Sequence, residues 1–516
     1  MRKFIYLISC VALGACGDDS GGSKPAPVPT LNVTLKPSVT SQTVPEADST
    51  SSFVLEASYT GSTSDPIYPK LTYDKTVLAL DGEMTRSGNG YTAKFKTLSG
   101  LSAKTYANTV SFQLCRDSDC ATVYPGSTQS FTHSLEVKLA DWTARQRNAR
   151  HDGFVHAAFD PSKFAKAWEV SPASATGFRE AAAGRGMVFV TQTSSDRSTV
   201  ALALDDASGA ERWRYSLGNL SYASGPALSG GSVVFSTMFT SSGNNPLVVL
   251  NADTGQFTKN FNFASQWSVF APPTTFENSI YISAGYYGNV VYGYDLNGDA
   301  ELWTGNGSAG HTWDGEAPAA DSRYVYYYSG NLDVFDRLTG ERVKSITDPF
   351  WQWNGYSYGG TPMLGSDNHV IAYSGNGMGT YAISFPLVDY DIAAGAYRWR
   401  TANGYSVIPA VANGVVYAAS NQTSQFDAID EQTGKIQWSW PRPAGEQFIG
   451  NIVVTDTLVF LSTDAAVYAI ATDGTHQTKW TAKTPGTLAV TSSAKLIVTP
   501  IQGTSSPMKV TAYSLR

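Results

Sequence analysis

Apolar and polar residues alternate in short runs from about residue 31 to residue 139. Alternation with a period of two is typical of half-buried strands, because successive side chains of a strand point to opposite faces. Turn sequences such as Asp81-Gly82 and the Ser-Gly-Asn-Gly stretch at 87–90 separate the runs. About seven such strands in this length predict a small β-sandwich, and nothing in them suggests chemistry.

The second half of this segment contains a pair of cysteines, Cys115 and Cys120, five residues apart. In an oxidising compartment such a pair is expected to form a structural disulfide, and the spacing is not that of a zinc or redox motif. The stretch from Tyr106 to Val137 resembles bacterial immunoglobulin-like modules. We therefore expect residues 31–139 to be an immunoglobulin-like β-sandwich that acts as a spacer.

Residues 140–516 follow a different pattern, in which similar turns recur at a nearly constant spacing. The turn glycines run from Gly209 to Gly474 in steps of about 44 residues, and a period of this size with several strands per unit is typical of a β-propeller. Asp-x-x-Thr-Gly within these turns is explained by turn geometry, since Asp accepts backbone N–H bonds and Gly adopts a positive φ.

Each repeat has the same order of elements. A strand of small residues and proline comes first, then an apolar strand, a third strand, the Asp/Gly turn, and an outer strand that carries a tryptophan. Lys259 and Lys344 occupy the tryptophan position in two repeats, so we expect looser docking there. Eight apolar second strands predict eight blades, and we expect residues 166–170 to complete the last blade and close the ring. The apolar second strands are 187–190, 233–235, 280–282, 324–326, 370–372, 415–417, 458–460 and 496–498.

This order of elements resembles the PQQ-like, or quinoprotein-type, repeat over nearly all of residues 141–516. The resemblance implies an all-β fold with an eight-bladed propeller after the small sandwich. Among such proteins, the chain resembles the propeller lipoproteins of the outer-membrane β-barrel assembly machinery, which lack the extra sandwich.

The N-terminus predicts a lipid anchor. Arg2 and Lys3 precede an apolar run that is too short to span a bilayer, as in a signal peptide. Residues 13–16, Leu-Gly-Ala-Cys, resemble the lipobox of bacterial lipoproteins, which implies a signal peptide at 1–15 and lipidation of Cys16. Gly17 after the cysteine implies sorting to the outer membrane, facing the periplasm. Residues 16–30, rich in Gly, Ser and Pro, are expected to form a flexible tether.

Composition limits the classes of function. Charged residues make up 15 % of the chain and the formal net charge is −7, so nucleic acid is not expected as a partner. Pyrroloquinoline quinone dehydrogenases stack their cofactor on a disulfide of adjacent cysteines, and this chain has no adjacent cysteines. His151 and His156 are expected to be surface or loop residues rather than metal ligands. We therefore expect no catalytic residues, no cofactor and no metal, and we expect the chain not to be an enzyme.

Aromatic residues outside the repeat positions indicate where a partner could bind. They lie in the long links between an outer strand and the next inner strand, and an exposed aromatic face marks a binding surface for protein or sugar. The alternative is that they plug the mouth of the central channel. The residues assigned to this partner or ligand face are Trp267, His311, Trp313, Asp314, Trp351, Trp353, Asn354, Tyr356, Tyr358 and Phe448.

These observations favour a non-enzymatic scaffold for protein–protein interaction in β-barrel assembly or another envelope complex. Its expected partners are envelope proteins, and the expected state is a monomer within a complex. A glycan-binding lipoprotein and a relative of the PQQ-dependent dehydrogenases are the alternatives.

Overall fold

The computed structural model describes residues 27–46, 50–220, 222–238, 244–265, 272–284, 290–308, 317–351, 361–374, 384–501 and 508–516. The chain divides into two compact units. One comprises residues 1–42, 50–98 and 107–135, and the other residues 43–49, 99–106 and 136–516. Strands dominate both units, and the described residues contain no α-helix. Among those residues, no helix is long and apolar enough to cross a membrane.

The strands of the N-terminal segment form two sheets, with the orders β1-β3-β7-β5 and β2-β9-β8-β4, and β6 pairs with β7. Along β3 buried and exposed residues alternate, as the sequence pattern predicts. Their apolar faces share one core, which contains Val33 and Tyr59 from one sheet and Phe112 and Leu114 from the other. The strands are β1 (Asn32–Pro37), β2 (Ser41–Pro45), β3 (Ser52–Thr60), β4 (Tyr68–Thr72), β5 (Leu78–Leu80), β6 (Thr85–Ser87), β7 (Gly90–Thr97), β8 (Thr105–Cys115) and β9 (Gln129–Lys138).

The disulfide between Cys115 and Cys120 is present, as expected. It closes the turn after β8, where Asp117 accepts hydrogen bonds from the backbone N–H groups of Ala121 and Thr122. These bonds hold the pKa of Asp117 below its ordinary value. The pair therefore has a structural setting in a short, internally bonded loop.

Eight sheets follow, and we take each as one blade, numbered 1 to 8 in chain order of their inner strands. Blades 1 to 4 are built from β12 (Ala175–Phe178), β13 (Ala182–Gly184), β14 (Met187–Ser194), β15 (Ser198–Asp205) and β16 (Glu211–Asn219); β17 (Tyr222–Ala223), β18 (Ala227–Ser229), β19 (Ser232–Met238), β20 (Asn244–Asn251) and β21 (Phe257–Ala264); β22 (Thr274–Phe276), β23 (Ser279–Ala284), β24 (Val290–Asp295) and β25 (Glu301–Asn306); and β26 (Ala319–Ala320), β27 (Tyr324–Tyr328), β28 (Asn331–Asp336) and β29 (Arg342–Thr347).

Blades 5 to 8 are built in the same way, and a short 3₁₀ turn, Pro161–Lys163, precedes β11. Their strands are β30 (Met363–Leu364), β31 (His369–Tyr373), β32 (Leu387–Asp391) and β33 (Ala396–Arg400); β34 (Ala410–Ala412), β35 (Val415–Ser420), β36 (Gln425–Asp430) and β37 (Ile436–Pro441); β10 (Phe154–Val155), β38 (Phe448–Thr455), β39 (Leu458–Thr463), β40 (Val467–Ala471) and β41 (Thr478–Ala482); and β42 (Thr487–Val490), β43 (Lys495–Thr499), β44 (Val510–Ser514) and β11 (Ala165–Val170).

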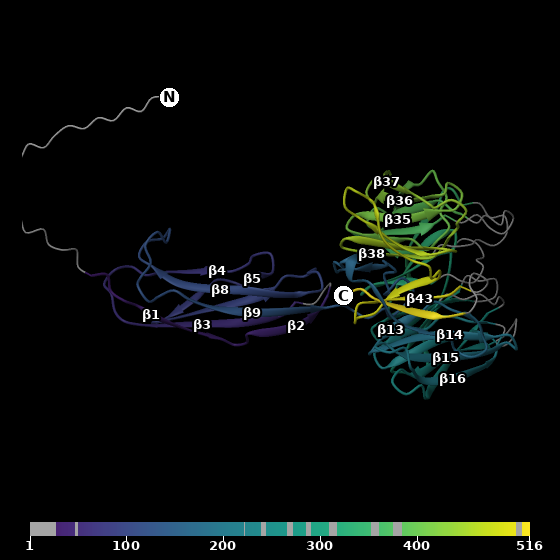
Figure 1. The fold of residues 1–516 in the computed structure, drawn as a ribbon, viewed down its shortest axis with the longest axis horizontal. Coiled ribbons are helices and arrows are strands. Elements are labelled where there is room, and N and C mark those ends of the chain that lie inside the picture. The colour runs from purple at the N-terminus through teal and green to yellow at the C-terminus, as the bar shows by residue number, and fades with distance from the viewer. Residues whose placement is uncertain are drawn as a thin grey trace, which may run out of the picture. The chain divides into compact units, whose positions relative to one another are not determined.

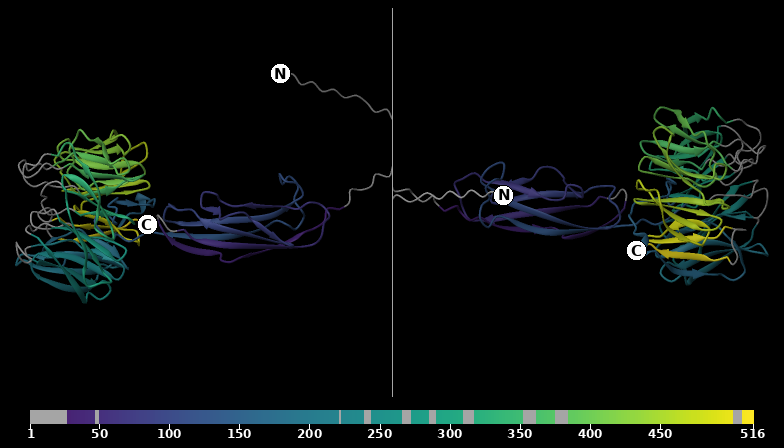
Figure 2. Two further views of the ribbon diagram at one scale, coloured as in Figure 1. Left: turned by 180° about the vertical axis from the view of Figure 1, so that it is seen from behind. Right: turned by 45° about the horizontal axis from the view of Figure 1, so that its top comes forward.

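The ring closes through its first and last strands. β11 pairs antiparallel with β44, so a strand from the N-terminal side completes blade 8, as the sequence predicts. The inner strand β42 of blade 8 also contacts β13 of blade 1. In Figures 1 and 2 the C-terminal strands, in yellow, accordingly lie between the green and teal blades. Within blade 8, β44 is thus paired on both sides, with β43 and with β11.

Tryptophans of the outer strands join neighbouring blades. The Trp213 indole lies over Gly255, in the turn of the next blade, and donates a hydrogen bond to the carbonyl oxygen of Ala252 at 2.9 Å. Gly255 has a φ of +70°, and a Cβ there would lie 2.5 Å from the ring of Trp213. Glycine is therefore required by both the turn and the indole. Trp168, Trp303 and Trp399 repeat this contact on Gly209, Gly340 and Gly434.

Both lysine joints keep the hydrogen bond, and the joint at Lys344 is looser than the indole joints, as expected. Lys344 donates from Nζ to the carbonyl oxygen of Ile392, and Lys259 donates to that of Leu296 at 3.0 Å. A Cβ on Gly395 would find the nearest atom of Lys344 at 3.6 Å, compared with 2.5–2.7 Å for the indoles at the tryptophan joints. Lysine thus replaces the indole N–H without filling the same volume.

Candidate interaction surfaces

The chain itself occupies the centre of the ring. Residues 141–157, which we call the axial segment, run past the inner strands of successive blades. Trp142 exchanges two backbone hydrogen bonds with Ala183 of blade 1, and the Thr143 carbonyl accepts from Leu228 of blade 2. Further along the axial segment, the carbonyl oxygens of residues 149, 150, 152 and 153 accept backbone bonds from the N–H groups of Ala320, Leu364, Val411 and Val454. It therefore bonds to one blade after another, and it ends in β10, paired parallel with β38.

Gln146 anchors the axial segment with its side chain. The amide nitrogen donates to the carbonyl oxygens of Pro409 at 2.6 Å and Ile452 at 3.0 Å, and its oxygen accepts from Asn451 at 2.7 Å. Gln146 is buried and has a φ of +50°. A non-glycine residue in this strained conformation persists only where its surroundings hold it, and here three hydrogen bonds do so.

His151 lies in this segment outside any regular secondary structure, in keeping with the loop position that the sequence allows, but it is completely buried. Nδ1 is 2.9 Å from the carbonyl oxygen of Pro362, which can only accept, so Nδ1 carries the proton. Nε2 then accepts from the Thr274 hydroxyl at 3.0 Å. Burial lowers the pKa of His151 to about 3, so the ring is neutral near pH 7. His151 is thus a structural group that links the axial segment to blades 3 and 5.

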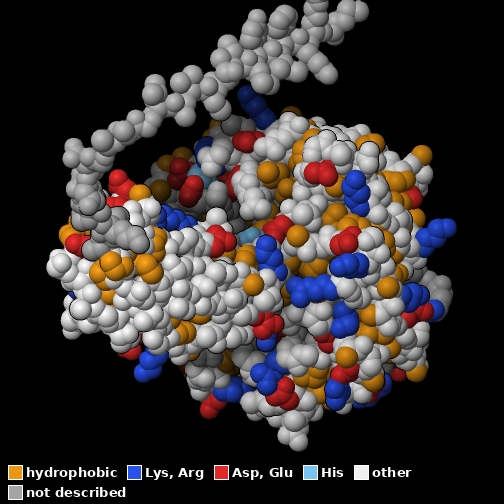
Figure 3. Space-filling model, turned by 60° about the vertical axis from the view of Figure 1, so that its left-hand side comes forward, with side chains coloured by type: hydrophobic (Ala, Val, Ile, Leu, Met, Phe, Trp, Pro, Cys, Tyr) orange, Lys and Arg blue, Asp and Glu red, His pale blue; other side chains and the backbone are white. Residues whose placement is uncertain are grey.

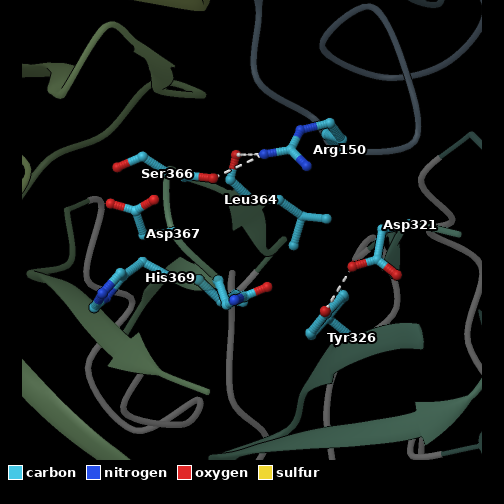
Figure 4. A pocket seen from close by; sticks show the side chains of 10 residues that line it. Arg150, Asp321, Tyr326, Leu364, Ser366, Asp367 and His369 are labelled. Carbon is cyan, nitrogen blue, oxygen red and sulfur yellow. Dashed lines mark hydrogen bonds between the residues drawn. The ribbon is translucent and has the colours of Figure 1, made fainter. Parts of the chain in front are cut away.

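A polar cavity of about 260 Å³ lies beside the axial segment between blades 4 and 5 (Figure 4). Arg150 donates from Nη2 to the carbonyl oxygens of Leu364 and Gly365. The Asp321 carboxylate accepts from the Tyr326 hydroxyl at 2.8 Å and from two backbone N–H groups. Arg150 and Asp321 therefore each have hydrogen-bond partners within the protein.

His369 is part of a second buried cluster next to that cavity. Its Nδ1 lies 3.2 Å from Oδ2 of Asp389, which also accepts from Nε of Arg398 at 2.7 Å. Burial raises the pKa of Asp389 to about 6, and the Arg398 guanidinium opposes the shift. No nucleophile is hydrogen-bonded to this histidine among the residues that the structure describes. In the same residues, no group of three His, Cys, Asp or Glu side chains could hold a metal ion.

Exposed apolar side chains of the propeller gather on one side of its rim. Seven large ones are exposed in the described part of this unit, and all lie in blades 2 to 6. The outer strands of blades 1, 7 and 8 present Arg212, Lys479 and Lys166 at the corresponding place. The seven are Phe257, Leu302, Leu338, Val343, Phe350, Tyr397 and Ile436.

Three of these residues form what we call the rim patch. Val343 on β29, Phe350 after β29 and Tyr397 on β33 have exposed fractions of 45, 37 and 42 %. The Phe350 and Tyr397 rings meet edge to face at 5.3 Å, with the Arg400 guanidinium 4.8 Å from the centre of Phe350. A cavity of about 330 Å³, lined by Val343 and Lys344, opens at the same joint. The patch therefore combines apolar side chains, a groove and two outer edge strands.

Most of the aromatic face predicted from the sequence lies outside the described residues. This applies to Trp267, His311, Trp313, Asp314, Trp353, Asn354, Tyr356 and Tyr358. Cys16 also lies outside them.

Two members of that face are described, and neither is fully exposed. Trp351 is half-buried, with its indole against Gly330. Phe448 is 2 % exposed, begins β38 and packs in the core with Trp440, so its assignment to a binding face is wrong. The apolar pair at 448–449 belongs to an inner strand rather than to a link.

Sequence reasoning missed Val343 and Tyr397 of the rim patch because these two residues lie inside regular repeats. The available signal is an apolar residue one or two positions before the outer-strand Trp or Lys, on the side that faces away from the blade. Basic and acidic side chains are intermixed on the face shown in Figure 3. That mixture is not the single-sign patch that nucleic acid requires.

Comparison with known proteins agrees with this fold. Residues 151–258 and 384–516 match the sequence model of a family described as outer membrane protein assembly factor BamB. The crystal structure of BamB from Moraxella catarrhalis aligns with a TM-score of 0.52 and 18 % identity, over 68 % of this chain and 99 % of that one. No curated protein matches the chain.

A WD40 β-propeller domain of Doa1 also aligns, with a TM-score of 0.39 and 10 % identity. The alignment covers 68 % of this chain and 97 % of that one.

Proposed function

Since the chain is a PQQ-like repeat β-propeller that resembles BamB, we propose that it is a non-enzymatic scaffold in outer-membrane β-barrel assembly or a related envelope complex. The observation that carries the proposal is the family match over both ends of the ring. The rim patch supports it, because monomeric soluble proteins rarely group exposed apolar residues without a partner.

We propose that the partner binds at the rim patch. The outer strands β29 and β33 each end a sheet, so their free edges can accept an added strand. Side chains of that strand would cover Val343 and Tyr397, and the groove at the Lys344 joint would take one more apolar side chain. The centre of the ring is a weaker candidate, because the axial segment already bonds to most of the inner strands.

We also propose that the mature chain is anchored by lipid on Cys16 and faces the periplasm from the outer membrane. The support is the lipobox at residues 13–16 and the resemblance to an outer-membrane assembly factor. Cys16→Ser should abolish incorporation of a labelled fatty acid and release the chain into the soluble fraction. Retention of Cys16→Ser in the membrane pellet would contradict the anchor.

The function is tested by co-purification of the full-length chain with the barrel-assembly proteins after mild crosslinking in cells. We expect these proteins to be recovered with the natural sequence. The double variant Val343→Glu/Tyr397→Glu should reduce their recovery about tenfold or more, because it places two charges in an apolar contact.

Thr478→Glu/Lys479→Glu on β41 is the matched control, since it changes the corresponding positions of blade 7. It should leave the recovery unchanged. Absence of barrel-assembly proteins from the material recovered with the natural sequence would refute the role in β-barrel assembly, and absence of any envelope protein would refute the scaffold function. Equal loss in both double variants would refute the rim patch as the binding surface.

A further inference from the structure

A cavity of about 380 Å³ lies between blades 1 and 2, away from the rim patch. Its walls come from the end of the β14–β15 hairpin, from β12 and from the link to β17. Arg179 and Arg197 both line it, together with the hydroxyl-bearing residues Thr176, Thr193, Ser194 and Thr199. Among the described residues, no Asp or Glu lines it. We call it the arginine cavity.

Both guanidinium groups have N–H donors that make no hydrogen bond among the described residues. Arg179 donates from Nε to the carbonyl oxygen of Ala223 at 3.1 Å, and its guanidinium carbon lies 4.1 Å from the centre of the Tyr222 ring. These contacts fix the plane of the group but leave its terminal N–H groups without a bond among the described residues. Arg197 is exposed, and its guanidinium makes no hydrogen bond or ion pair within the same residues.

The acidic neighbours of these arginines in the sequence are engaged elsewhere. Glu180 accepts from Arg145 at 3.4 Å. Asp196 accepts from the backbone N–H and the hydroxyl of Ser198, and these bonds lower its pKa. The positive charges of Arg179 and Arg197 are therefore not balanced inside the cavity, although the whole chain carries a formal charge of −7.

The hydroxyl groups complete the lining. Thr176 donates to the carbonyl oxygen of Thr193, and Thr193 to that of Gly177, so these threonines hold the walls together. The Ser194 hydroxyl makes no such bond in the described structure and is free to donate. The cavity thus offers two guanidinium groups and one hydroxyl donor, and none of its described lining residues carries a carboxylate.

We propose that the arginine cavity binds a phosphate monoester. Guanidinium groups pair with oxyanions through parallel N–H donors, and two of them match the charge of about −1.5 to −2 that a phosphate monoester carries at pH 7. A carboxylate would leave one arginine unbalanced. The cavity is also within the size range of small-molecule sites, so the phosphate can carry a few further atoms.

Isothermal titration of the full-length chain at low ionic strength tests the site, with inorganic phosphate, glycerol 3-phosphate and sodium acetate as ligands. We expect saturable binding of both phosphates with a Kd of about 1 mM or lower, and much weaker binding of acetate. Arg197→Gln should weaken phosphate binding about tenfold or more. Arg214→Gln, an exposed arginine of the same blade, is the control and should change nothing.

Vesicles that contain phosphatidic acid separate a lipid source from a soluble one. Binding of glycerol 3-phosphate alone assigns a soluble ligand, and additional Arg197-dependent binding of the vesicles assigns a lipid headgroup. Absence of phosphate binding, equal binding of acetate, or binding that Arg197→Gln leaves unchanged would overturn the proposal. Since Arg197 is exposed, an unchanged thermal midpoint verifies that the variant is folded.

Discussion

The centre and the rim of the ring are held together in different ways. At six of the joints at the rim, one side chain of the outer strand links two blades: an indole over a turn glycine at four joints, and a lysine in its place at two. At the centre, a segment that occurs once in the chain bonds to the inner strands mainly through its backbone. A side-chain contact that recurs at the joints can vary from one joint to the next, whereas the axial segment occurs once and cannot vary in this way. The exposed apolar residues, and with them the proposed partner site, lie at the rim.

The largest loss is expected from Trp213→Ala at the rim. The variant empties the space over Gly255 and removes the hydrogen bond to Ala252, and loss of a buried tryptophan costs about 4 kcal/mol. The free energy of unfolding of the propeller, measured with denaturant, checks this. Trp213→Phe keeps most of the apolar contact and should lose less than half as much. A loss below about 1 kcal/mol for Trp213→Ala would show that the indole does not hold the joint.

Gln146→Ala should cost nearly as much at the centre. It leaves two carbonyl groups unpaired in the interior and removes one of the two bonds donated by the Asn451 amide, which corresponds to about 3 kcal/mol. The same denaturant measurement applies, with the exposed Gln477→Ala as the control. If both variants unfold at the same denaturant concentration as the natural chain, Gln146 does not anchor the axial segment.

Because His151 is buried at the centre of the ring, we predict that acid lowers the stability of the propeller. Its pKa is about 3 in the fold and 6.5 in the unfolded chain, so only the unfolded state binds the proton between these values. Stability should therefore fall by about 2 kcal/mol as the pH is lowered from 6.5 to 5. His151→Gln lacks this contribution. Asp389, with a raised pKa, acts in the opposite direction below pH 6, but it does so in both proteins.

The difference between the natural chain and His151→Gln consequently isolates the histidine. Unfolding of both proteins at pH 7 and pH 5 measures it. Equal pH dependence in the two would mean that His151 is protonated in the fold and not buried as described.

Lys344→Ala should have the smallest effect, a loss of about 1 kcal/mol. Its Nζ bonds only to backbone carbonyls and the groove beside it is already open, so little packing is lost. Comparison with Trp213→Ala measures how much tighter an indole joint is than a lysine joint. Equal losses in the two variants would contradict the distinction between the joints.

The sequence predicts the joints between blades at the rim well and the bonding at the centre of the ring poorly, for a physical reason. Trp213, Gly255 and Lys344 stand at positions that occur once in each repeat, and turn geometry and side-chain volume suffice to interpret them. Gln146 contacts Ile452, 306 positions away, and such a partner leaves no local pattern. The burial of His151 likewise depends on Thr274, 123 positions away, and on Pro362, so the sequence around the histidine does not indicate it.

The binding surface shows the same limit. The sequence assigns Phe448 to an exposed face as an aromatic residue of a link between an outer and an inner strand, whereas its backbone begins the inner strand itself. Val343 and Tyr397 went unnoticed because their repeats look regular, and only the burial of their neighbours distinguishes them.

Native-state hydrogen exchange tests most directly whether the axial segment is bonded to the inner strands of the blades. The amides of Leu228, Ala320, Leu364, Val411 and Val454 donate to its carbonyl groups at 2.7–2.9 Å. We predict that these five amides exchange as slowly as those of the central strands β14 and β35. Exchange of the five at the rate of exposed turn amides would show that the axial segment is not bonded to the blades, and would contradict the account.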